Sequence, residues 1–159
     1  MFWAQIVVTW LHVLLAIFWF GGSLYNVFVL GPAVMMLPAE GQLTLYRAMT
    51  KRRAAEILEG VGVITVLLGI IRGSLLGPVR SIDFLVNTPY GITWGIALLL
   101  AAGVLAWSRF VIQPKSEQFA TAAAAGDMVA VRKAAPLLLL ELLGFFGIFT
   151  CMILMRFGL

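Results

Sequence analysis

One apolar segment near the N-terminus carries a line of polar and small residues, and the only histidine of the chain lies within that line. Successive members are separated alternately by four and three residues, which places them on one face of an α-helix. The members are Gln5, Thr9, His12, Ala16, Trp19, Ser23 and Asn26. An imidazole in apolar surroundings can ligate a heme iron, ligate copper, or hydrogen-bond to a neighbouring helix.

The heme interpretation gives the histidine the role of axial ligand to the iron of heme b. Two aromatic residues of the same helix could wall the porphyrin, and two glycines on a second apolar segment could leave room for its flat face. An arginine on that second segment could pair with a propionate, or it could simply extend its charge to the membrane surface. The residues of this predicted site are His12, Trp19, Phe20, Gly62, Gly69 and Arg72.

The alternative is a copper site. A rise of about 1.5 Å per residue places His12 in the same layer of the membrane as three sulfur residues near the C-terminus. Imidazole suits copper, and thiolate or thioether sulfur suits Cu(I). The alternative ligands are therefore His12, Cys151 and Met155, with Met152 close by. A third possibility is a structural subunit without a cofactor, in which the histidine only joins two helices.

Long apolar helices must position these residues. The chain has 159 residues, of which 62% are hydrophobic and 11% charged, so it is too apolar for a soluble domain. Its one cysteine cannot form an internal disulfide. Four segments are long enough to cross a bilayer, and prolines punctuate their ends. They cover residues 3–30, 57–76, 91–112 and 136–155. We therefore predict an all-α transmembrane four-helix bundle that forms one domain, residues 1–159.

The basic residues predict the orientation of this bundle. Eight of the eleven lie in or beside the first and third connections, and the positive-inside rule places both connections inside. Both termini are then outside, which in a bacterium is the periplasmic side of the inner membrane. Stretches 40–53 and 115–133 mix charged and apolar residues at helical spacing and predict short interfacial helices. The basic pI is thus explained by topology, and we expect membrane lipid rather than nucleic acid as partner.

The first helix resembles a known pattern. His12, Trp19, Phe20, Gly22 and Tyr25 keep the spacing His-x6-Trp-Phe-x-Gly-x2-Tyr, which is similar to the first helix of HemJ-type protoporphyrinogen oxidases. The Trp-x-Gly-Gly run and the later Pro-Ala pair also resemble the CopD-like copper-resistance membrane domains. The likeness covers roughly the first seventy residues.

This resemblance implies a small helical membrane protein, a homodimer, with a heme or copper role. In HemJ-type proteins the first-helix histidine binds heme b, and it corresponds to His12. These proteins also use a lysine on a later helix, whereas the third predicted span has none. The resemblance thus extends to heme binding with a redox or heme-handling role, and it leaves enzymatic activity, the electron-transfer partner and any small-molecule substrate open.

Overall fold

The computed structural model describes residues 2–159, and all regular structure within that range is helical. Four continuous helical rods are long and apolar enough to cross a membrane. Each contains almost all of one predicted span, so the protein is an all-α membrane protein, as predicted. The rods cover Phe2–Met35, Ala54–Leu75, Pro89–Ala124 and Met128–Arg156.

The rods consist of the following elements. The first contains α1 (Phe2–Tyr25), η1 (Asn26–Leu30) and α2 (Gly31–Met35), and the second contains α4 (Ala54–Ile70) and η2 (Ile71–Leu75). The third contains α6 (Pro89–Trp107), η3 (Ser108–Ile112), η4 (Gln113–Lys115) and α7 (Ser116–Ala124). The fourth contains α8 (Met128–Arg132) and α9 (Ala135–Arg156). Two short helices lie in the connections, α3 (Ala39–Lys51) and α5 (Ile82–Asn87).

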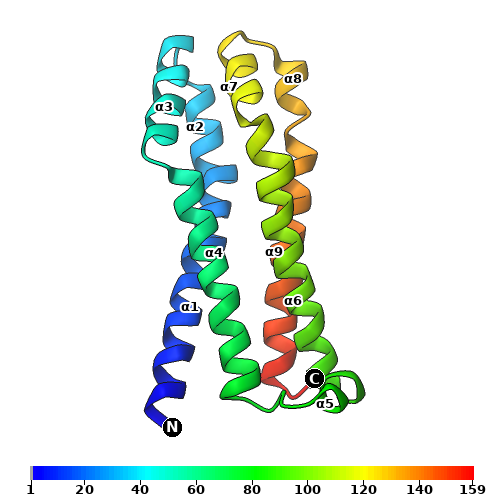
Figure 1. The fold of residues 1–159 in the computed structure, drawn as a ribbon. Coiled ribbons are helices and arrows are strands. Elements are labelled where there is room, and N and C mark those ends of the chain that lie inside the picture. The colour runs from blue at the N-terminus through cyan, green and yellow to red at the C-terminus, as the bar shows by residue number, and fades with distance from the viewer. Residues whose placement is uncertain (1) are drawn as a thin grey trace.

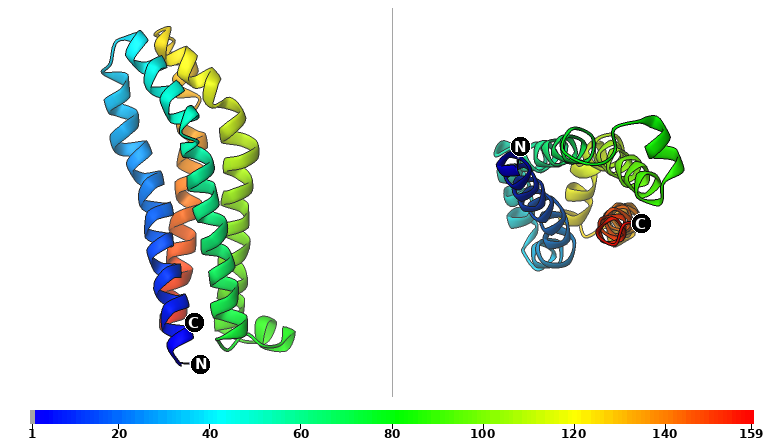
Figure 2. Two further views of the ribbon diagram at one scale, coloured as in Figure 1. Left: turned by 60° about the vertical axis from the view of Figure 1, so that its left-hand side comes forward. Right: turned by 90° about the horizontal axis from the view of Figure 1, so that it is seen from below.

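The bundle is built from two antiparallel pairs, α1 with α4 and α6 with α9 (Figure 1). Seen along the bundle, α1, α4, α6 and α9 follow one another around its axis, so that α1 and α9 are neighbours (Figure 2, right). Contacts within each pair are far more extensive than contacts between the pairs. The seam between the two pairs is therefore where internal space can remain.

Both chain ends lie at one end of the bundle, and the basic connections lie at the other (Figure 1). Helices α3 and α7 lie at this basic end. Figure 2 (left) shows α3 and α7 inclined to the long axis of the bundle, and the Tyr46 hydroxyl lies 3.3 Å from Ser116 Oγ where they meet. The expected helices are therefore present in the basic connections, and α3 packs against α7.

Two prolines that were expected to end their helices instead lie inside continuous rods. Proline has no N–H and its ring clashes with a carbonyl of the preceding turn. Each rod accommodates its proline with a wider π-helical turn just before it. Ahead of Pro32, the Gly31 N–H bonds to the Asn26 carbonyl. Ahead of Pro114, the Gln113 N–H bonds to the Ser108 carbonyl. The rods therefore extend well past the predicted spans at this end.

A buried hydrophobic cluster lies near the middle of the bundle, formed by Trp19, Val104 and Phe145. The Trp19 and Phe145 rings meet edge to face with centroids 4.8 Å apart. Glycines allow this approach: a Cβ on Gly62 would come within 2.6 Å of the Trp19 ring, so only glycine fits beneath it. This aromatic layer separates the half of the bundle that carries the termini from the half that carries the basic connections.

Candidate functional site

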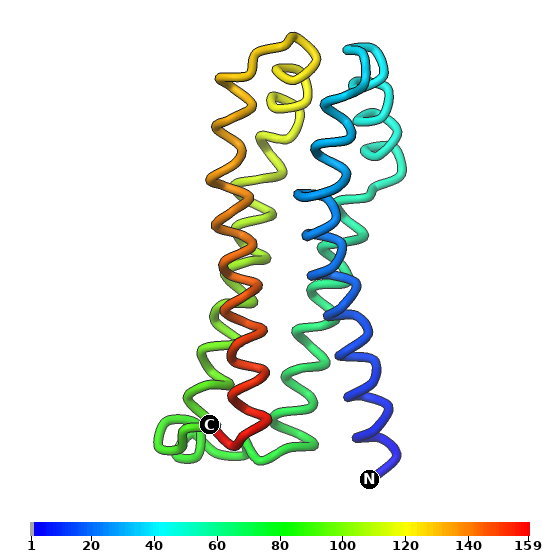
Figure 3. The backbone as a smooth tube through the Cα atoms, turned by 180° about the vertical axis from the view of Figure 1, so that it is seen from behind, coloured from blue at the N-terminus to red at the C-terminus, as the bar shows by residue number. Residues whose placement is uncertain are grey.

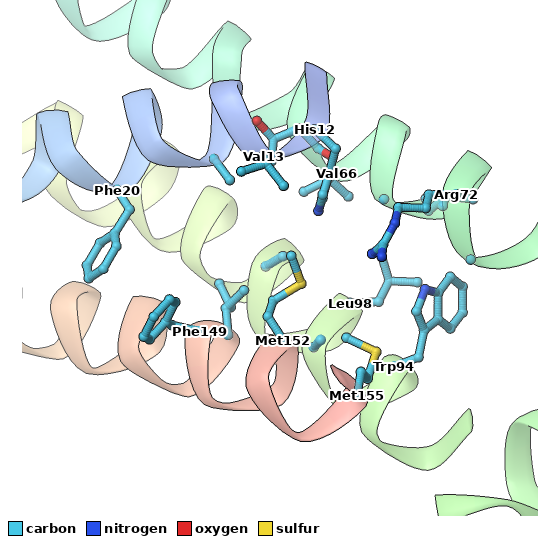
Figure 4. A pocket seen from close by; sticks show the side chains of 18 of the residues that line it. His12, Val13, Phe20, Val66, Arg72, Trp94, Leu98, Phe149, Met152 and Met155 are labelled. Atoms are coloured by element: carbon cyan, nitrogen blue, oxygen red, sulfur yellow. The ribbon is translucent and has the colours of Figure 1, made fainter. Parts of the chain in front are cut away.

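Below the aromatic layer, the two helix pairs enclose a cavity of about 420 Å³. All four rods contribute to its wall, which is almost entirely apolar. Figure 4 shows the polar and sulfur-bearing side chains that face the space. The polar, aromatic and sulfur-bearing lining residues include His12, Arg72, Trp94, Met152, Met155 and Arg156. Most of a bulky apolar ligand could be buried in a cavity of this size.

His12 lies on the wall of this cavity, where α1 packs against α4. Its side chain is only 7% exposed, and its Nδ1 lies 2.9 Å from the Thr65 carbonyl oxygen. Because a carbonyl can only accept, Nδ1 carries the proton and donates. The ring approaches the backbone of α4 closely: a Cβ on Gly69 would stand 3.0 Å from His12 Cε1. Gly69 thus admits the imidazole, and Thr65 fixes its tautomer.

The second ring nitrogen of His12 remains available. Within residues 2–159, Nε2 has no hydrogen-bond partner, and a water-sized molecule can reach it. The imidazole faces the cavity, with Met152 across the space from it (Figure 4). A neutral imidazole whose Nδ1–H is held by a carbonyl presents the Nε2 lone pair, which is the state required of a metal ligand.

Two arginines make the terminal end of the cavity cationic. The Nε of Arg72 donates to Thr9 Oγ1 at 3.2 Å, so this side chain is held at the cavity wall and does not simply extend to the surface. Arg156, the last residue of α9, lines the same cavity. Neither arginine forms an ion pair with a carboxylate of the described chain. An anionic group at this end would therefore meet two unpaired positive charges.

Sequence reasoning did not include Arg156 in the site. A signal was present, because Arg156 follows Met152 by four residues and so lies on the same face of its helix. Trp94 was also not among the predicted site residues, and it lines the cavity beside Arg72 (Figure 4). Gly73, four residues after Gly69, makes room for its indole.

The sulfur residues divide differently from the predicted copper site. Met152 and Met155 line the cavity, whereas Cys151 is buried elsewhere and is absent from the lining. Adjacent residues on a helix point about 100° apart, so Cys151 and Met152 cannot share one direction. Of the predicted set, His12 and Met155 line the cavity and Cys151 does not, whereas Met152 does. Within residues 2–159, no three His, Cys, Asp or Glu side chains cluster as a metal site.

The aromatic residues and glycines that were predicted to surround a porphyrin do not all line the cavity. Trp19 and Phe20 line the inner end of the cavity, and Phe20 stacks on Phe145 with ring centroids 5.3 Å apart. Gly62 does not line the cavity, because the Trp19 ring already fills the space it leaves. The predicted room for a flat ligand at Gly62 is thus occupied by protein.

The polar line on α1 faces the bundle only in its middle. His12, Trp19 and Ser23 are buried as expected, whereas Gln5 and Asn26 at its two ends are exposed. In Figure 3, α1 diverges from α9 toward the N-terminus, so its first turns lack a partner on that side.

Comparisons of this chain with family models, with curated proteins and with solved structures found no match. The likeness to HemJ-type and CopD-like proteins therefore stays a hypothesis resting on the first-helix motif.

Proposed function

We propose that this membrane protein binds heme b in the cavity through His12 and has a redox or heme-handling role. One observation carries the proposal: Nδ1 of His12 is held by the Thr65 carbonyl while Nε2 faces a large apolar cavity without a partner in the described chain. A cavity of 420 Å³ is far larger than a single metal ion needs, and its apolar wall suits a porphyrin.

The other lining residues have roles that fit this ligand. Trp19 and Phe20 would cover the porphyrin at the inner end, while Arg72 and Arg156 would bind its propionates. The thioether of Met152, across the cavity from His12, would be a further ligand for the iron. When bound, the heme would supply one-electron chemistry, and the chain would tune it through its ligands, apolar wall and arginines.

The test is the absorption spectrum of protein purified in detergent from cells supplied with a heme precursor. We expect a Soret band in the wild type and its loss in His12→Ala. Ser23→Ala is the matched control, because Ser23 is a buried polar residue of the same helix face that does not line the cavity. Full heme content in His12→Ala would refute the proposal and leave the histidine a link between helices in a structural subunit.

A copper role is the second candidate, and it is supported by the one imidazole and two thioethers that line the same cavity. Imidazole and thioether ligands suit Cu(I), and the revised ligands are His12, Met152 and Met155. Competition titration with a chromogenic Cu(I) chelator tests it. Met152→Leu should weaken Cu(I) binding, whereas Cys151→Ser should not. Equal Cu(I) affinities in wild type and Met152→Leu would argue against this site.

We also propose a location and an orientation for the protein. The basic end of the bundle would face the cytoplasm and both termini the periplasm of a bacterial inner membrane. We further propose a homodimer, as the first-helix resemblance implies, with an electron-transfer partner at the periplasmic end, where the cavity lies.

A further inference from the structure

The cavity wall is not equally closed on all sides. The lining residues contributed by α4, η2 and α6 are all buried or half-buried. The exposed lining residues lie on α1 and α9 alone, and they are Val13, Ile17, Phe149, Ile153 and Arg156. The cavity therefore has its mouth along the α1–α9 seam.

The course of the two helices explains this mouth. Near the middle of the bundle, α1 and α9 are joined by Phe20, which meets Phe145, Phe146 and Phe149 with centroid separations of 5.3, 5.4 and 6.4 Å. Toward the termini the two helices diverge (Figure 3). The aromatic contact closes the inner end of the seam, and the outer part remains open to the side.

The mouth faces lipid rather than water. Its four apolar residues lie within two of the membrane-spanning rods, and a bilayer surrounds such surfaces with acyl chains. The cationic pair of Arg72 and Arg156 lies at the terminal end of the same cavity, where α9 stops. A molecule with an apolar body and an anionic group matches both features, because its body fills the cavity while its charge meets the arginines.

We propose that the cavity takes its ligand sideways from the bilayer, through the α1–α9 seam, and that this ligand is a membrane-dissolved amphiphile bearing a carboxylate. The open seam and the arginine pair support this inference whether or not the ligand is heme. Only the identification of the amphiphile with heme b, whose propionates supply the carboxylates, rests on the proposed function.

The test uses vesicles that contain the protein and a fatty acid with a diazirine on its chain. After photolysis, labelled residues are mapped by mass spectrometry. Leu98 lines the cavity from α6, opposite the mouth, whereas Leu99 is 74% exposed on the outside of that helix. We expect label on both residues in the wild type. In Val13→Trp/Ile153→Trp, which fills the mouth, Leu98 should lose its label and Leu99 should keep it.

Matched variants separate the mouth from general effects. Leu67→Trp/Ile92→Trp places the same bulk on exposed residues of α4 and α6 that do not line the cavity, and it should leave the labelling of Leu98 unchanged. Arg72→Gln/Arg156→Gln should reduce labelling of Leu98 by the fatty acid but not by its methyl ester. An unlabelled Leu98 in the wild type, or equal labelling of Leu98 in the mouth variant, would overturn the proposal.

Adding hemin to the same vesicles distinguishes this inference from the proposed function. Protection of Leu98 from the fatty acid would support both, because the two ligands would compete for one cavity. Labelling of Leu98 that hemin leaves unchanged would count against heme as the occupant and would leave the lateral route supported.

Discussion

Nδ1 of His12 donates a hydrogen bond to the carbonyl oxygen of Thr65, 2.9 Å away and on the facing helix. This bond joins α1 to α4, and it also determines which ring nitrogen is free. Both a purely structural histidine and a metal-binding histidine can make this hydrogen bond, and the two differ in what faces Nε2. Here an apolar cavity faces it, which favours ligand binding.

The close approach of His12 to Gly69 predicts that residue 69 is sensitive to substitution. A methyl group at residue 69 would stand 3.0 Å from His12 Cε1, so Gly69→Ala should displace the ring and shift or weaken the Soret band of the heme-loaded protein. Gly60→Ala on the same helix meets no atom within 4 Å, and it should leave the band unchanged while stabilising the helix by about 0.5–1 kcal/mol. Identical spectra and thermal unfolding for the two variants would contradict this.

The packing of Trp19 on Gly62 predicts a stability effect independent of any cofactor. A Cβ at residue 62 would overlap both the Trp19 ring and Leu105, and overpacking of this kind costs about 1–3 kcal/mol. Gly62→Ala should therefore lower the thermal unfolding temperature in detergent. Gly103→Ala, at a site with open space around it, is the matched control and should not lower it. Equal unfolding temperatures in the two variants would refute the packing described for this layer.

The arginine pair predicts how ligand affinity depends on charge. Arg72→Gln and Arg156→Gln should each weaken hemin binding by about 1.5–3 kcal/mol, the contribution of a hydrogen bond to a charged group. Binding of hemin dimethyl ester, which lacks the carboxylates, should not change. Arg80→Gln removes a charge outside the cavity lining, from a side chain that bonds to the Gly77 carbonyl, and serves as control. Equal losses for hemin and its ester would mean that the arginines do not bind the carboxylates.

The distribution of basic residues predicts the orientation of the bundle in the membrane. Alkaline phosphatase fused to the C-terminus should be active in a bacterial host, because the fusion would lie in the periplasm. A green fluorescent protein fused directly at the same point should stay dark. Placing either reporter between Ala124 and Met128, at the basic end, should reverse both results. Fluorescence from the C-terminal fusion would show the opposite orientation.

Much of the architecture follows from composition and length. A run of about 20 apolar residues has few stable forms other than a membrane helix, so the four spans could be predicted from the sequence. Pro32 and Pro114 show the limit of such rules, because a π-helical turn lets each rod continue through its proline. The continuation past Pro114 is α7, which packs against α3.

The sequence by itself determined that this chain crosses the membrane four times and that its histidine belongs to the inward face of the first helix. The tertiary structure alone decided which residues of the last helix join it. Around α9 nearly every side chain is apolar, so hydrophobicity does not distinguish a face that meets lipid from one that meets protein. The choice of Met152 over Cys151, and the inclusion of Arg156, depend on the rotation of α9 against its neighbours, which packing sets.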